Sequence, residues 1–148
     1  MSVHPSLPSI VGTWRLLSHR TVFDNGDAIS LFGTTPRGRL IVTAGGYMMA
    51  FVVDPRRQQG NTDEQCAALH RSMVAYGGAY RVEGNKFLVA VDLSWHQMWD
   101  GTEQARTFMI ENDTLHIRTA PAASVLRPGR VSHTDLVWER DRQGSPHR

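Results

Sequence analysis

The residues best suited to chemistry lie around the segment SWHQMW, Ser94 to Trp99, which combines two of the chain's four tryptophans with a histidine. The unperturbed pKa of a histidine lies near neutrality, so His96 is a candidate general acid or base. Asp92 is the candidate second acid/base or orienting group. The DGT that follows predicts a loop, and we expect Trp95 and Trp99 to form its rim or lid over an apolar pocket.

Arg106 lies on the next predicted strand, so strand pairing decides what it faces. If the intervening loop is centred near its second tryptophan, Asp92 faces Arg106. The tight turn at 111–113 then places Thr119 beside Arg106, with Phe108 on the same face toward the closed end. We therefore expect a carboxylate, a guanidinium and a hydroxyl on one inner wall. The alternative is a structural Asp92–Arg106 pair beneath tryptophans that plug one barrel end.

The elements that position these residues are mostly strands. Short apolar runs rich in Val, Ile, Thr and aromatic residues, separated by Gly, Asn and Asp, are typical of strands and turns. Eight strands are expected, at residues 11–22, 37–43, 47–53, 79–83, 86–94, 102–110, 114–120 and 131–140. Tight turns alternate with long connections, which in a meander places every long loop at one end. The sequence predicts an all-β, eight-stranded antiparallel up-and-down barrel, whose interior fills with side chains or holds one small ligand.

The segment NTDEQCAALHRSMVAYG interrupts this pattern with a helix. Thr62 followed three residues later by Gln65 is a capping box. Helical spacing then relates Cys66, Leu69, Met73 and Tyr76. We expect one helix between strands three and four near the barrel mouth. Two positions are open for it: over the opening, with Tyr76 near the ligand, or against the outer wall.

The first and third strands supply further inward candidates. Alternation along the first strand favours an inner face made of Trp14, Leu16, Ser18 and Arg20. A buried Arg20 needs an anionic partner, either Asp92 or a ligand carboxylate, unless its side chain bends out to solvent. On the third strand, the turn at 44–46 suggests an inner face made of Tyr47, Met49 and Phe51.

Composition excludes several functional classes. The 148 residues fit one domain, 1–148, with a core from about 10 to 140 and flexible termini. A net charge of +2 with scattered basic residues argues against a nucleic-acid partner, and no apolar run is long enough for a membrane span or signal peptide. The lone Cys66 fits a reducing, cytoplasmic compartment. No metal-ligand spacing or phosphate-binding glycine loop is present, so we expect no metal and no cofactor. The oligomeric state is open, with a homodimer as one alternative.

Five blocks in order, GTWRLLS, GRLIVTAGGYM, AYGGAYRV, WDGTEQAR and LVWER, resemble the lipocalin-like domain family of bacteria and fungi. The resemblance covers residues from about 10 to 140. It implies a single barrel, of a kind often encoded among secondary-metabolism genes. It also implies that Trp14 of the Gly-x-Trp motif closes the bottom of the barrel and that Arg140 from the last strand stacks on it.

Three functions remain open. The first is binding of a small hydrophobic or aromatic molecule whose polar or anionic end is held by Arg106 and Arg20. The second is a cofactor-independent isomerase, cyclase or dehydratase of secondary metabolism, with His96 and Asp92 as the acid/base pair in a water-poor cavity. The third is a structural subunit whose aromatic loop contacts a partner.

Overall fold

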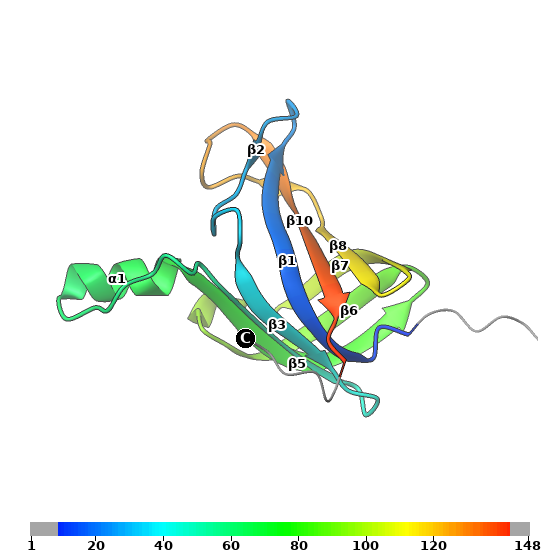
Figure 1. The fold of residues 1–148 in the computed structure, drawn as a ribbon. Coiled ribbons are helices and arrows are strands. Elements are labelled where there is room, and N and C mark those ends of the chain that lie inside the picture. Colours follow the sequence, from blue (N-terminus) through cyan, green and yellow to red (C-terminus); the bar gives the residue numbers. More distant parts are fainter. Residues whose placement is uncertain (1–8, 143–148) are drawn as a thin grey trace, which may run out of the picture.

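The structure is a computed structural model that describes residues 9–142, so the expected flexible termini lie outside the described residues. Figure 1 shows its strands wrapped around a common interior. The strands are β1 (Gly12–Phe23), β2 (Ala28–Ile29), β3 (Arg37–Val42), β4 (Tyr47–Val53), β5 (Met73–Glu83), β6 (Lys86–Ser94), β7 (Glu103–Glu111), β8 (Thr114–Thr119), β9 (Ala122–Ala123) and β10 (Val131–Arg140). The helices are α1 (Asp63–Arg71) and the short 3₁₀ helix η1 (Gln97–Trp99).

Eight of these strands close into an antiparallel barrel. The hydrogen-bonded order is β1-β3-β4-β5-β6-β7-β8-β10, and β10 pairs back onto β1. The strands β2 and β9 are two-residue additions beside β1 and β10. The predicted fold class is therefore confirmed, and α1 lies between β4 and β5, the third and fourth strands of the barrel.

The helix begins as predicted and ends earlier than predicted. The backbone N–H of Gln65 donates to the Thr62 hydroxyl at 3.1 Å, and the Gln65 side chain accepts from the Thr62 N–H at 3.1 Å. The helix stops at Arg71, so Met73 and Tyr76 belong to β5 and not to the helix. Pairing of β5 with β4 overrides the helical spacing there. No residue of α1 is buried, and Figure 1 shows it projecting beyond β4 and β5. Both positions expected for it are wrong.

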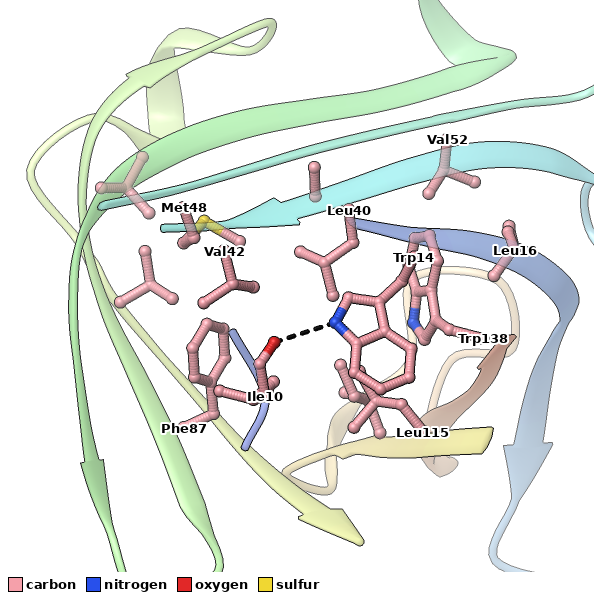
Figure 2. Close-up of a cluster of buried hydrophobic side chains, with 14 of the residues drawn as sticks. Ile10, Trp14, Leu16, Leu40, Val42, Met48, Val52, Phe87, Leu115 and Trp138 are labelled. Atoms are coloured by element: carbon pink, nitrogen blue, oxygen red, sulfur yellow. Dashed lines mark hydrogen bonds between the residues drawn. The ribbon is translucent and has the colours of Figure 1, made fainter. Parts of the chain in front are cut away.

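The closed end of the barrel is built around Trp14. Its Nε1 donates to the Ile10 carbonyl at 2.9 Å, as Figure 2 shows, and its ring is fully buried. The Arg140 guanidinium carbon lies 4.2 Å from the ring centroid, which confirms the expected stacking. Gly12 has φ +142°, and a Cβ there would lie 2.8 Å from Arg140 Nη1. The glycine of the motif therefore leaves room for the arginine.

An irregularity in β1 changes which of its residues face inward. The register with β10 shifts between Leu16 and Ser18. An extra residue in one strand inverts the alternation beyond it. The inner face after the shift consists of His19, Thr21 and Phe23, all buried. The prediction that Ser18 and Arg20 face inward is therefore wrong, and Arg20 lies exposed on the outer wall.

The inner face of β4 is also the opposite of the one expected. Met48, Ala50 and Val52 are buried, whereas Tyr47, Met49 and Phe51 are between 36% and 49% exposed. The segment YMMAFVV is apolar on both faces, so alternation alone does not distinguish them. Pairing does, because Ala50 lies opposite Leu40, which in turn lies opposite the buried Trp14.

Candidate functional site

The barrel holds a cavity of about 700 Å³. Most of its wall is apolar, with a few polar groups from β1, β5, β7, β8 and β10. The apolar lining includes Leu31, Phe32, Leu40, Met48, Ala50, Val52, Val74, Phe87, Ile117, Leu136 and Trp138. A concave apolar site with a small number of placed polar groups is typical of small-molecule binding.

Arg106 lies on this cavity, as expected. It pairs with the buried Phe87 on one side and with Thr119 on the other, so all three share the inner face. Its guanidinium donates to the Ala105 carbonyl at 3.1 Å and to the Gln104 side-chain oxygen at 3.3 Å. Both acceptors are neutral, and within residues 9–142 Arg106 forms no ion pair. Its charge is therefore available to an anion.

Asp92 does not face Arg106. The residue opposite Arg106 is Phe87, five residues before Asp92 on β6. Because successive side chains of a strand point to opposite faces, Asp92 lies on the outer face. The expected register assumed that the loop between β6 and β7 is centred near Trp99. Ala90 instead pairs with Glu103, so this loop is centred before Trp99.

On the outer face, Asp92 has a different partner. The hydroxyl of Tyr47 donates to its carboxylate at 2.7 Å. This hydrogen bond, together with desolvation and the nearby negative charge, raises the pKa of Tyr47. Neither residue lines the cavity, so the expected inner-wall pair of Asp92 and Arg106 is wrong.

The two indole rings of the tryptophan loop lie edge to face, with their centroids 5.2 Å apart, and each has a further neighbour of its own. Trp99 lines the cavity and lies against Tyr76 of β5, with ring centroids 5.1 Å apart. Trp95 contacts the helix instead, because its Nε1 donates to the His70 carbonyl at 3.2 Å. Trp99 therefore lies at the cavity, as expected for both rings, whereas Trp95 does not line it.

His96 does not line the cavity either. Its Nδ1 accepts from the backbone N–H of Met98 at 3.2 Å, which caps η1. Its ring lies 5.2 Å from that of His70 and 5.7 Å from that of Trp95. The expected acid/base role of His96 and Asp92 at the cavity is thus not supported by their positions.

His19 is one of the cavity residues that were not expected from the sequence, as are Thr21 and Thr134. It is 9% exposed, lines the cavity, and has its ring centroid 4.8 Å from that of Phe32. Burial lowers the pKa of His19 to about 4, so the imidazole is neutral near pH 7. Its Nδ1 is buried without a hydrogen-bond partner. Only the shift in β1 brings it inside, and nothing in the pattern LLSHR marks that shift.

The other predicted site residues divide between the two sides of the wall. Thr119, like Tyr76 and Trp99, lines the cavity. Phe108 packs against the buried core without lining the cavity. Arg20 borders a separate hollow on the outer wall, near Arg118 and Asp135.

The described part of the chain contains no group of three His, Cys, Asp or Glu side chains placed to hold a metal ion. Within the same residues, no helix is long and apolar enough to cross a membrane.

Comparison with known proteins agrees with this architecture. The model of the lipocalin-like domain family matches residues 11–141, which is nearly the whole chain. A comparison with curated proteins found no match.

Proposed function

The chain belongs to the lipocalin-like domain family, and on this premise we propose that its barrel binds a small hydrophobic or aromatic molecule with an anionic or polar end. The observation that best supports the proposal is an inward-facing Arg106 on the wall of a mostly apolar cavity of about 700 Å³. A cavity of this size accommodates a molecule of a few fused rings.

The charge of Arg106 supports an anionic end. A half-buried guanidinium with only neutral acceptors is poorly compensated, because partial desolvation weakens its interaction with water. A ligand carboxylate would accept two parallel hydrogen bonds from it. The anionic group of the ligand therefore belongs beside Arg106, near Thr119.

The rings around the cavity support an aromatic body. Trp99 and Tyr76 form one aromatic pair on the wall, and Phe32 lies on the wall beside His19. Offset or edge-to-face contacts with these rings would add to the area that a flat ligand buries.

The test is calorimetric titration of the full chain with 2-naphthoic acid and with the neutral 2-naphthol. Arg106→Met keeps much of the bulk and deletes the charge, so binding of the acid should weaken by roughly 2–4 kcal/mol while 2-naphthol is little affected. Arg20→Met is the matched control, because it removes an arginine from the outer wall. Equal binding of the acid by Arg106→Met and the parent would contradict the proposal, as would absence of binding to either probe.

His19 supports a second candidate, a cofactor-independent isomerase, cyclase or dehydratase. A neutral imidazole on a water-poor wall can accept a proton, which is the role expected of His96 and Asp92. For this function, the chain should accelerate α-proton exchange of 2-tetralone in D₂O, observed by NMR, and His19→Gln should abolish the acceleration. Exchange at the uncatalysed rate in the parent would favour binding alone.

The cellular compartment and the oligomeric state of the protein stay predictions. The single, exposed Cys66 supports a reducing, cytoplasmic compartment. A homodimer remains one alternative, to be measured by light scattering.

A further inference from the structure

The polar groups of the cavity are gathered on one part of its wall. Thr21 of β1 pairs with Thr134 of β10. The backbone N–H of Thr134 donates to the hydroxyl of Thr119 on β8 at 2.8 Å, and Thr119 pairs with Arg106 of β7. These four inward side chains, Thr21, Thr134, Thr119 and Arg106, form a continuous row across four neighbouring strands, called the polar row below. All four line the cavity.

Two hydroxyls of the polar row have no partner within residues 9–142. Among the described residues, the side chains of Thr21 and Thr134 make no hydrogen bond, and the residue Thr21 is only 5% exposed. Neither hydroxyl is among the fully buried atoms without a partner, so both are open to the cavity and can exchange a hydrogen bond with water for one with a ligand. His19, the inward residue before Thr21 on β1, adds an imidazole beside this end of the row. The arrangement is suited to oxygen atoms of a ligand.

The wall across the cavity is different in character. The strands β3 to β6 line it with Leu40, Met48, Ala50, Val52, Val74 and Phe87, and Tyr76 is their one polar contribution. A ligand in this cavity therefore meets hydrogen-bonding groups on one side and hydrocarbon on the other. Such a division favours a molecule whose oxygen atoms lie along one edge.

The length of the polar row limits the size of that edge. Neighbouring strands lie about 4.8 Å apart, so three steps from Arg106 to Thr21 span about 14 Å at the backbone. The side chains converge toward the barrel interior, which shortens the distance between their polar ends. A bicyclic or tricyclic ring system reaches from one end of the row to the other.

Resting on the proposed function, we propose that the ligand is a fused-ring aromatic acid that carries further hydroxyl or keto oxygens along one edge. Its carboxylate binds Arg106, and its other oxygens bind the hydroxyls of Thr21 and Thr134. Thr119 already accepts a backbone N–H, so it contributes less to discrimination between ligands. The polar row thereby selects oxygenated aromatic acids over bare ones.

The experiment compares 2-naphthoic acid with its 3-, 6- and 7-hydroxy derivatives by calorimetry on the full chain. At least one hydroxylated acid should bind about fivefold or more tightly than the parent acid, as expected for one net hydrogen bond. Thr21→Val or Thr134→Val should remove this advantage, so that the variant binds the hydroxylated acid no more tightly than it binds 2-naphthoic acid. Thr107→Val, on the outer face of β7, is the matched control and should retain it.

The outcomes separate the two proposals. If 2-naphthoic acid binds but no hydroxylated acid binds more tightly, or if the advantage survives in both valine variants, the polar row does not select oxygen atoms and only this inference fails. If none of the four acids binds, the proposed function fails and the inference fails with it. The comparison of ligands on the parent chain needs no variant, so it stands even where a substitution impairs folding.

Discussion

The guanidinium of Arg140 lies over the indole of Trp14, with its central carbon 4.2 Å from the ring centroid, and joins the last strand of the barrel to the first. Loss of the ring would remove this contact and leave a cavity at the closed end. Trp14→Ala should therefore lower the free energy of unfolding by about 3–5 kcal/mol, measured by urea denaturation. Leu93→Ala, at a side chain that is 56% exposed, is the control. A Trp14→Ala protein that melts within a degree or two of the parent would contradict this account.

Gly12 should be sensitive to addition of a single methyl group. Its φ of +142° is one that side chains rarely adopt, and the added Cβ would lie 2.8 Å from Arg140 Nη1. Gly12→Ala should cost about 1–3 kcal/mol of stability. Gly45→Ala is the matched control, because the nearest atom to its added Cβ, Thr43 Oγ1, is 3.9 Å away. Equal unfolding midpoints for the two variants would argue against the packing role of Gly12.

The barrel and most strand bounds could be predicted because they depend on local signals. Turn residues and short apolar runs mark where a strand ends, and the capping box at Thr62 marks the helix start correctly. The Trp14–Arg140 contact could be expected only from the family resemblance. The turns, the strand bounds and the helix start do not depend on the detailed pairing of distant residues.

Side-chain orientation was harder to predict, because a register shift by an odd number of residues moves every side chain of a strand to the other face of the sheet. The irregularity after Leu16 brought His19 inside and turned Arg20 outside, and the displaced loop centre turned Asp92 away from Arg106. By contrast, the tight turn before β8 fixed its register, so Thr119 was correctly placed beside Arg106.

His19 should make stability depend on pH. Its pKa is about 4 in the folded protein, against 6.5 for an unperturbed histidine, because burial disfavours the charged ring. Below pH 6.5 the unfolded chain therefore binds the proton first, and stability is lost as the pH falls toward 4. The loss over this window should be about 3 kcal/mol.

The measurement is urea denaturation at several pH values between 6.5 and 4.5, for the parent and for His19→Phe. Subtraction of the two curves removes the contribution of the other titrating groups. The variant should show a flatter dependence on pH. Parallel curves would mean that the ring of His19 is not buried in its neutral form.

Asp92→Asn should affect the outer surface and not the cavity. Removal of the carboxylate charge should lower the pKa of Tyr47, because the hydrogen bond and the negative charge that raise it are weakened or lost. Ultraviolet titration of tyrosine against the parent measures this change. Binding of 2-naphthoic acid should stay the same, in contrast to its loss in Arg106→Met. Weaker binding in Asp92→Asn would restore Asp92 to the site.

The two tryptophans of the loop should respond differently to a ligand. Trp99 lines the cavity, whereas the Nε1 of Trp95 donates to the His70 carbonyl of α1. Saturation with 2-naphthoic acid should therefore shift the indole N–H signal of Trp99 in a ¹⁵N-correlated NMR spectrum far more than that of Trp95. Phenylalanine variants of each residue assign the two signals. Trp14, buried at the closed end, provides an internal reference that should move little. If the Trp95 signal moved and the Trp99 signal did not, the ligand would lie between the loop and α1, and the loop would be better explained as a surface that contacts a partner.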